Sequence, residues 1–197
     1  MSGVGLILLA AGGSSRMGRP KQLLAYQGRT LLRRAAETAV ASACAPIIVV
    51  VGARDEHISR ELQGLPGVNI EPNPDWNRGM GTSIRAGLRR VLRESPEVSG
   101  IVIMLCDQPH VGAIHIRQLV ELHRETARSV IASEYAGTLG PPAFFSRARF
   151  ADLQRIDDAS GAKGIITAAE SDRAVLSIPD AGIDIDTPED FRRLTEG

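Results

Sequence analysis

The chain has 197 residues, 43% of them hydrophobic and 23% charged, the balance of a soluble globular protein with a sizeable core. Basic and acidic residues number 23 each, so the formal net charge is zero and the composition argues against nucleic-acid and membrane partners. The two cysteines, Cys44 and Cys106, cannot form a disulfide framework, and the apolar start is too short to cross a membrane. We therefore expect one domain over residues 1–197, in the cytoplasm, with both thiols buried.

Apolar runs of strand length alternate with helical patterns along the chain. The predicted strands, in chain order, are Gly5–Ala10, Ile47–Val51, Val68–Ile70, Ile101–Leu105, Val130–Ala132 and Ala174–Ile178. The predicted helices are Leu31–Ser42, Thr82–Arg93 and Ile114–Thr126, with Thr30 and Thr82 as N-caps of the first two. This order predicts an α/β fold of three layers, αβα, around a Rossmann-like, mostly parallel sheet. Ligands of such sheets bind beyond the carboxyl ends of the strands.

The first predicted strand runs into a glycine-rich turn that carries two cations. Gly12 and Gly13 allow backbone N–H groups to approach an anion closely, because they have no Cβ. Arg16 and Lys21 add side-chain charge, and no acidic residue precedes Glu37. Strand, glycine turn and cations together predict a cradle for a triphosphate.

This turn does not follow the two common phosphate-binding motifs. Gly13 and Gly18 have the spacing of a Walker A loop, but Arg19 stands where that motif needs lysine. A dinucleotide fingerprint, G-x-G-x-x-G, is not present either. On the glycines alone, an ordinary strand-to-helix turn with surface basic residues remains the alternative.

The predicted strand Ile101–Leu105 delivers an aspartate to the same edge of the sheet. Pro109 prevents the strand from continuing, so Asp107 lies just beyond its carboxyl end. A carboxylate there can hold Mg²⁺, which bridges it to phosphate oxygens. An aspartate that caps the next turn is the structural alternative, but a triphosphate beside Asp107 requires a cation between them.

Two further segments carry candidate residues. In 184–190, Asp184 and Asp186 alternate on one face of an extended segment, and Thr187 then begins a helix whose acidic first turn suits the helix dipole. The loop at 73–83 contains the single tryptophan, Trp76, and opens the helix predicted from Thr82. Helix N-termini bind anions, so this loop could contact the nucleotide. For Trp76 the alternative is that its ring fills the core below the loop.

The motifs together resemble a known family. Residues 9–21 are similar to the signature L-A-A-G-x-S-x-R-M-G-x-P-K of small nucleotidyltransferases. Residues 106–109, 184–190 and 73–83 resemble its C-D-x-P, D-x-D-T-P-E-D and N-P-x-W-x-x-G-M-x-x-S motifs. Within that superfamily the chain most resembles the molybdenum cofactor cytidylyltransferases, the MobA-like group, over nearly its whole length.

The resemblance implies an activity, a metal and partners. The family transfers CMP from CTP to molybdopterin and releases pyrophosphate, with Mg²⁺ held here by Asp107 and Asp186. Arg16, Lys21 and Asp107 are the expected catalytic residues, because charge on phosphoryl oxygens must be stabilised. The protein that receives the product is implied to be a molybdenum hydroxylase of the xanthine dehydrogenase type. The residues expected to contact the nucleotide are Ala10, Ala11, Gly12, Gly13, Ser14, Arg16, Lys21, Gly81 and Ser83.

Some segments match the family only in part. Residues 140–145 resemble its acceptor-side G-x-P-x-x-F segment, and would otherwise be an apolar turn with two core aromatics. In 161–164, Ala162 replaces the acid of a G-D-x-G-A segment, although Lys163 could face a phosphate. The alternatives that remain are a guanylyl branch, another sugar-phosphate or small-phosphate nucleotidyltransferase, a catalytically silent nucleotide-binding regulator, and a redox or flavin module.

Overall fold

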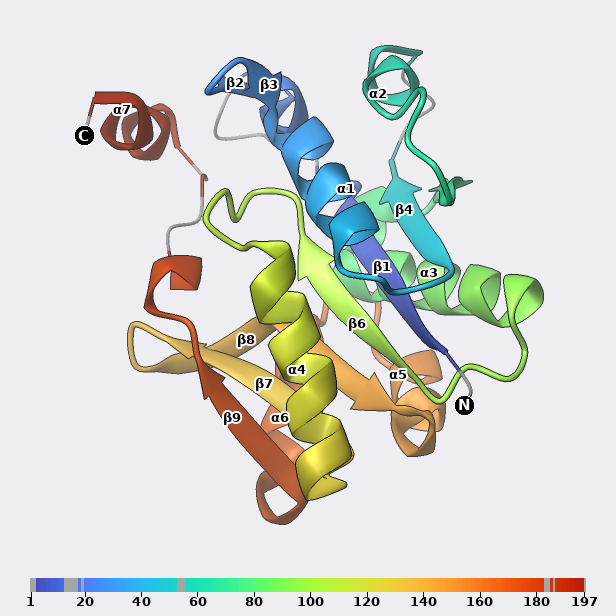
Figure 1. Cartoon of the computed structure of the whole chain (residues 1–197). Helices are drawn as coiled ribbons and strands as arrows, with labels where there is room; N and C mark the ends of the chain where they lie inside the picture. The colour runs from blue at the N-terminus through green and yellow to red at the C-terminus, as the bar shows by residue number, and fades with distance from the viewer. Residues whose placement is uncertain are drawn as a thin grey trace.

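The computed structural model describes residues 3–12, 18, 20–52, 56–182, 185 and 187–196 (Figure 1). Strands and helices alternate along these residues. The strands of the main sheet are β1 (Val4–Ala10), β4 (Ile47–Val51), β5 (Val68–Pro72), β6 (Gly100–Leu105), β7 (Val130–Tyr135), β8 (Thr138–Ser146) and β9 (Arg173–Ser177). A small hairpin consists of β2 (Ala25–Tyr26) and β3 (Arg29–Thr30). The α-helices are α1 (Leu31–Ala41), α2 (Glu56–Glu61), α3 (Met80–Glu94), α4 (Ala113–Thr126), α5 (Phe150–Gln154), α6 (Lys163–Ala168) and α7 (Pro188–Glu196).

The main sheet is mostly parallel, as the alternation of elements predicts. Its seven strands follow the order β5-β4-β1-β6-β8-β7-β9. β5, β4, β1 and β6 pair in parallel, and β7 pairs in parallel with β9. Within the described sheet only β8 runs the opposite way, paired antiparallel with both β6 and β7.

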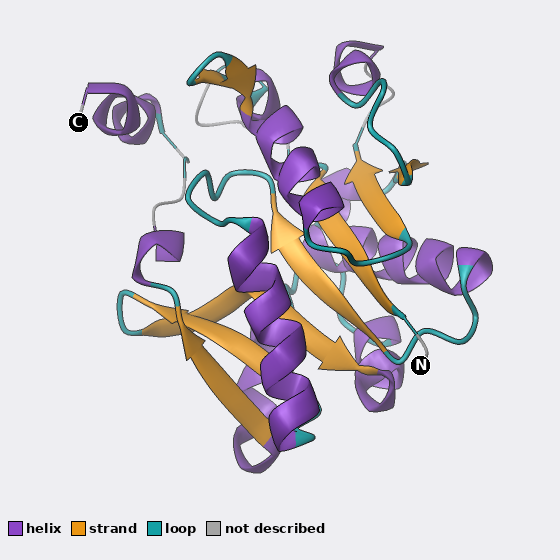
Figure 2. Cartoon of the chain, viewed as in Figure 1, coloured by secondary structure: helices purple, strands orange, loops and turns teal. Residues whose placement is uncertain are grey.

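Helices cover both faces of the sheet, which gives three layers (Figure 2). In β1, Leu6 and Leu8 belong to the apolar cluster shared with α1 and α4, while Ile7 and Leu9 belong to the cluster shared with α3, α5 and α6. Successive side chains of a strand point to opposite faces, so this uninterrupted apolar strand is buried on both sides. The αβα fold is therefore confirmed.

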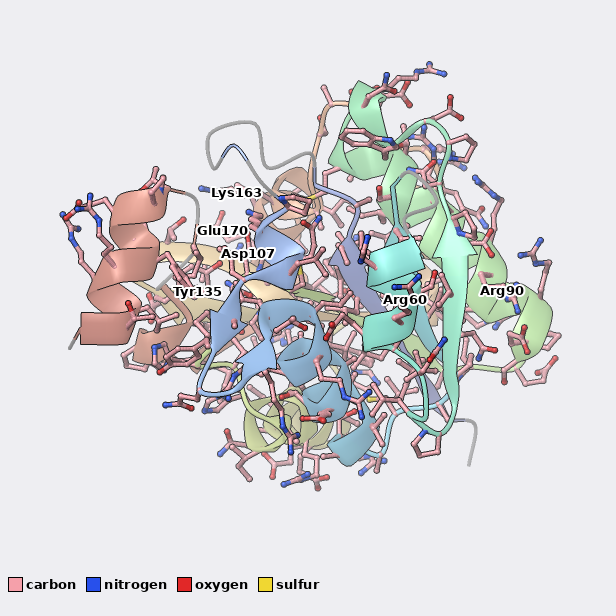
Figure 3. All side chains as sticks on the ribbon, turned by 90° about the horizontal axis from the view of Figure 1, so that it is seen from above. Arg60, Arg90, Asp107, Tyr135, Lys163 and Glu170 are labelled. Atoms are coloured by element: carbon pink, nitrogen blue, oxygen red, sulfur yellow. The ribbon has the colours of Figure 1, made fainter. Side chains whose placement is uncertain are left out.

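The carboxyl ends of β1 and β6 lie side by side at one edge of the sheet. Leu9 is in register with Leu105, and the N–H of Cys106 donates to the carbonyl of Leu9 (3.3 Å). Because the strands are parallel, the chain segments that follow them, beginning at Ala11 and at Cys106, emerge at the same edge. Figure 3 looks down on this edge and labels Asp107.

The strand β8 differs from the prediction for residues 140–145. Gly140-Pro141-Pro142 indicates a turn, yet these residues lie inside a nine-residue strand. Proline cannot donate to a ladder, and the register of β7 against β8 shifts between Ala132 and Ser133, beside this stretch. The hydroxyl of Ser133 donates to the carbonyl of Pro142, so a side chain replaces part of the ladder.

The start of α3 also differs from the prediction that Thr82 is its N-cap. The helix begins at Met80, with Gly79 as N-cap at a φ of 132°. Thr82 lies in the first turn, where its hydroxyl donates to the carbonyl of Gly79 (2.8 Å). Glycine adopts this conformation without a steric penalty, which moves the helix start back by two residues.

The helix start predicted after Asp186 is confirmed for the described residues. The N–H of Asp190 donates to the hydroxyl of Thr187 (3.2 Å), and the N–H of Thr187 donates to the carboxylate of Asp190 (2.8 Å). This reciprocal pair is a capping box. The helix α7 then packs Phe191 and Leu194 against a small apolar cluster that joins it to the β2–β3 hairpin.

Both thiols are buried in the described structure, as composition predicts. None of the helices in the described ranges is long and apolar enough to cross a membrane.

Candidate active site

An ion pair joins the two segments that emerge at this edge. The ammonium of Lys21 donates to Oδ2 of Asp107, and both side chains are largely buried, with exposed fractions of 15% and 12%. Lys21 opens a short 3₁₀ turn (Lys21–Leu23) after the glycine-rich segment, and Asp107 follows β6. Two residues 86 positions apart, each predicted to be catalytic, are therefore in direct contact.

A buried glutamine fixes the ends of the glycine-rich turn. The side-chain amide of Gln22 donates to the carbonyls of Ala10 and Gly12, each at 2.8 Å, and only 3% of Gln22 is exposed. These bonds hold the last residue of β1 and the first glycine of the turn close to the element that carries Lys21. The motif places no functional residue at position 22, and its polar side chain between Lys21 and Leu23 gave no sign of burial.

The other residues predicted in this turn divide into two groups. Ala10 and Ala11 are buried, and Gly12 is exposed, with space for a Cβ that would lie 3.9 Å from Cε of Lys21. The turn thus has an open backbone position directly beside the lysine. The predictions for Gly13, Ser14 and Arg16 lie outside the described residues.

The segment before α7 returns to the same edge. The N–H of Ile185 donates to the backbone carbonyl of Asp107 (3.1 Å), and Ile185 is fully buried. The prediction for Asp186 lies outside the described residues, as does Asp184 on the same face of the segment. Ile185 nevertheless shows that the chain passes Asp107 at the position next to the predicted second ligand.

The start of α3 is tied to the end of β5 by a buried asparagine. The amide of Asn73 donates to the hydroxyls of Thr82 (2.8 Å) and Ser83 (3.0 Å), and its oxygen accepts from the N–H of Asp75 (3.1 Å). Asn73 and Ser83 are buried. Ser83, predicted to face the base, thus has its hydroxyl bonded within the protein, and Asn73 is a positioning residue that sequence reasoning did not single out.

Gly81, the other residue predicted to face the base, lies against the loop at 157–158. Its N–H donates to the carbonyl of Asp158 (2.9 Å), and a Cβ at this position would stand 2.0 Å from the carbonyl oxygen of Asp157. The carboxylate of Asp158 in turn pairs with Arg85 and Arg78. Hydrogen bonding from Arg85 and the charge of both arginines hold the pKa of Asp158 below its ordinary value.

Trp76 packs over the edge of the sheet rather than in its core. The ring is half-buried, and a Cβ on Gly52, just beyond β4, would lie 3.0 Å from its Cγ. The same Cβ would lie 3.2 Å from the carbonyl oxygen of Ala11. Glycine at position 52 therefore allows the indole to approach the turn that follows β1.

Gln108, next to the ion pair, connects the site to β8. Its amide donates to the carbonyls of Pro141 (3.1 Å) and Ala181 (3.0 Å), and its Nε2 lies 3.5 Å from the hydroxyl of Tyr135, which Figure 3 labels beside Asp107.

Cys106 precedes Asp107 in the sequence. Complete burial and the charge of Asp107 raise the pKa of the Cys106 thiol to about 12. Burial therefore favours the protonated, uncharged form of this thiol.

Lys163 lies at the start of α6, where its ammonium donates to the hydroxyl of Thr138 (3.0 Å) at the beginning of β8. Ala162, which replaces the acid of the family motif, is buried. In the part of the chain that the structure describes, no three His, Cys, Asp or Glu residues gather as a metal cluster. A cation at this edge would thus depend on Asp107, on the segment around Ile185 and on oxygens of a bound phosphate.

Comparison with known proteins gives relatives of several functions. The chain is 33% identical to the purine catabolism protein PucB of Bacillus subtilis over 196 residues, which cover 94% of this chain and 92% of that protein. It is 26% identical over 191 residues to the molybdenum cofactor cytidylyltransferase of Escherichia coli, covering 97% and 95% of the two chains. The nicotine blue oxidoreductase of Paenarthrobacter nicotinovorans is 37% identical over 119 residues, 60% of this chain and 56% of that protein.

A solved structure has the same fold throughout. Rv0371c from Mycobacterium tuberculosis superposes with a TM-score of 0.83 at 30% identity, covering all of this chain and 98% of that one. A second structure of Rv0371c is a complex with manganese and superposes with a TM-score of 0.80. The family model described as the MobA-like NTP transferase domain matches residues 6–174. The chain with the Lys21–Asp107 pair at its sheet edge therefore belongs to the MobA-like nucleotidyltransferase family.

Proposed function

We propose that this protein transfers CMP from CTP to molybdopterin and releases pyrophosphate, with Mg²⁺. One observation carries the proposal: a largely buried ammonium and carboxylate, Lys21 and Asp107, meet beside the glycine-rich turn where two parallel strands end. That edge is where α/β sheets bind ligands. The similarity to the Escherichia coli molybdenum cofactor cytidylyltransferase over 97% of this chain supports the choice of base and acceptor.

The ion pair suits a phosphoryl site. In the free protein the ammonium of Lys21 serves as the counter-cation of Asp107. When a triphosphate binds, we infer that the ammonium turns to the α-phosphate as a compact point charge, and that Arg16 neutralises the β- and γ-phosphates. Gln22 holds the carbonyls of Ala10 and Gly12, which fixes the start of the turn beside the element that carries Lys21.

The residues at the edge fit a divalent cation. Asp107 is a buried carboxylate that already binds a positively charged group, and hard cations prefer such oxygen ligands. We propose Asp186 as the second ligand, since its neighbour Ile185 is hydrogen-bonded to Asp107. Bound there, Mg²⁺ supplies Lewis-acid stabilisation of charge on the phosphoryl oxygens. The manganese complex of Rv0371c supports a divalent metal in proteins similar to this one.

The acceptor phosphate needs no general base in this proposal, because a phosphomonoester is largely ionised at pH 7. The protein residues then act by position and charge, which supply most of the catalysis in phosphoryl transfer. We further propose that the product passes to a molybdenum hydroxylase of the xanthine dehydrogenase type.

Pyrophosphate release tests the proposal directly. The protein is incubated with CTP, GTP, ATP or UTP and with Mg²⁺ or Mn²⁺, with and without molybdopterin. Release with CTP that depends on both metal and molybdopterin is the expected result. Release with GTP instead assigns the chain to a guanylyl branch. Release only with a sugar or alcohol phosphate would show that this phosphate, and not molybdopterin, is the acceptor. Nucleotide binding without release under any of these conditions supports a silent regulator.

The relative named nicotine blue oxidoreductase favours a second candidate, a redox function. That similarity covers 60% of this chain, whereas a dinucleotide fingerprint is absent from its sequence. Oxidation of NADH or NADPH in the presence of a quinonoid dye, together with no pyrophosphate release, is the outcome that would replace the transferase proposal.

A further inference from the structure

A groove of about 600 Å³ lies behind the loop that carries Asp107. It is bounded by the β2–β3 hairpin, by one side of α1, and by residues 106–113 between β6 and α4. In Figure 1 these three elements stand together on the viewer's side of the sheet. The volume is within the range of about 300–1,000 Å³ that small-molecule sites occupy.

The groove lies beside the nucleotide edge, on the face of the sheet that α1 and α4 cover. Cys106, which lines it, belongs to the apolar cluster under α1 and α4, whereas Gly81, on the nucleotide side, belongs to α3, which packs on the opposite face of the sheet. Gly12 and Lys21 do not line it. A ligand in the groove would therefore be additional to the nucleotide.

A buried acceptor in the lining has no donor in the described parts of the chain. Gln108 is 4% exposed, and its Oε1 makes no hydrogen bond in the described structure. The orientation of the amide is fixed, because Nε2 donates to the carbonyls of Pro141 and Ala181, and a carbonyl can only accept. A buried acceptor without a partner destabilises the protein, so a ligand donor at this point would be favourable.

A guanidinium in the same lining has no acid partner among the residues that the structure describes. Arg34 lies over the ring of Tyr26, 4.9 Å from its centroid, and its buried Nε–H has no acceptor among the described residues. The ring contacts the flat face of the guanidinium, so its edge, which carries the donors, remains available for an anion. The nearby cation Arg29 differs, because its charge is already paired with Glu37.

We propose that this groove binds a small organic anion whose carboxylate or phosphate contacts Arg34 and whose N–H or O–H donor satisfies Gln108. The two unpartnered groups define the chemistry of the ligand: one anionic group and one hydrogen-bond donor on the same small molecule. Because Gln108 directly follows Asp107, the occupant rests on the backbone that positions the catalytic carboxylate. This inference does not depend on which nucleotide or acceptor the protein uses.

Two soluble anions and NMR spectroscopy test the site. Inorganic sulfate supplies the anion alone, because it carries no O–H donor at neutral pH, and phosphoserine supplies the anion with an ammonium donor. Each is titrated into the ¹⁵N-labelled full chain, and the signals of the Arg34 side chain and of the Gly112 backbone are followed. Saturable shifts are expected with both probes, with phosphoserine binding about two- to tenfold more tightly, the gain of one hydrogen bond.

Variants distinguish the groove from the nucleotide site. Arg34→Gln and the groove-filling Thr38→Trp are expected to weaken binding at least about tenfold, whereas Lys21→Ala is expected to leave it unchanged. Arg124→Gln is the control, because Arg124 lies on the exposed side of α4 and pairs with Glu121. Absence of saturable shifts at Arg34, or shifts that persist in Arg34→Gln, would overturn the site. Equal affinity for the two probes would overturn the role of Gln108.

Discussion

Asp107 is the residue on which the proposed chemistry depends most. Asp107→Asn keeps the size and one acceptor oxygen but removes the charge that pairs with Lys21 and that would bind a metal. We expect pyrophosphate release to fall at least about 100-fold, the scale of losing one electrostatic group at a reaction centre. Asp152→Asn, at a half-buried acid of α5 that pairs with Arg149, is the control and should retain full activity. Activity of Asp107→Asn close to that of the control would exclude Asp107 as a ligand.

Gln22 offers a test of how the turn is held. Gln22→Leu fills the same space but leaves the carbonyls of Ala10 and Gly12 without their donor. The free energy of unfolding should fall by about 1–3 kcal/mol, and KM for the nucleotide should rise. Urea denaturation and steady-state kinetics measure the two effects. Gln63→Leu, at an exposed position, is the control. Equal unfolding midpoints for the two variants would contradict a stabilising role of the Gln22 hydrogen bonds.

At the scale of residues, the sequence predicts charged groups better than the neutral groups that position them. Asp107 stands out because it directly follows an apolar strand, and Lys21 because it lies in a basic, glycine-rich turn. A charged side chain at such a position indicates a ligand or an ion pair. Gln22 and Asn73 are equally buried, but a single polar residue in a loop gives no signal that its amide will bind groups of another segment. Their roles depend on tertiary contacts.

At the scale of elements, the contact between α3 and the loop at 157–158 makes opposite predictions for two glycines. Gly81→Ala would place a Cβ 2.0 Å from the carbonyl oxygen of Asp157, so the loop must move and stability should fall by about 1–3 kcal/mol. Gly164→Ala, in α6, meets nothing within 4 Å and should stabilise the protein by about 0.5–1 kcal/mol. Thermal unfolding compares them, and a stabilised Gly81→Ala variant would contradict this packing.

The sheet elements show why β1, β4 and β6 can be predicted from the sequence and why β8 cannot. β1, β4 and β6 are continuous apolar runs, which strands buried on both faces require. β8 contains Gly140, Pro141 and Pro142, whose local preference is for a turn. It is a strand because it fills the space between β6 and β7, and that pairing is a long-range property.

At the scale of the whole molecule, acid is expected to destabilise the fold. Partial burial opposes ionisation of Glu37, but hydrogen bonds from two arginines outweigh it and lower its pKa. Hydrogen bonds from Ser129 lower the pKa of Asp172, and arginines do the same for Asp158. A carboxyl whose pKa is lowered by folding stabilises the protein fully above its ordinary value, and this stabilisation is lost as the pH falls through the folded-state pKa.

The free energy of unfolding should therefore decrease below about pH 4, where these carboxyl groups bind protons. Urea denaturation between pH 7 and pH 3 measures the decrease. The triple variant Glu37→Gln, Asp158→Asn, Asp172→Asn should be less stable at pH 7 and should show a shallower decline. If the free energy of unfolding falls equally steeply with pH in both proteins, groups other than these three carboxyls cause the loss of stability in acid.

The most direct test of the central claim is mass spectrometry of the reaction products. The wild-type protein and Asp107→Asn are each incubated with CTP, Mg²⁺ and molybdopterin. The wild type should form a product with the mass of molybdopterin plus CMP less one water, and the variant should form almost none. Unreacted CTP and molybdopterin with the wild type, under conditions in which the protein is folded and binds CTP, would contradict the proposed transfer.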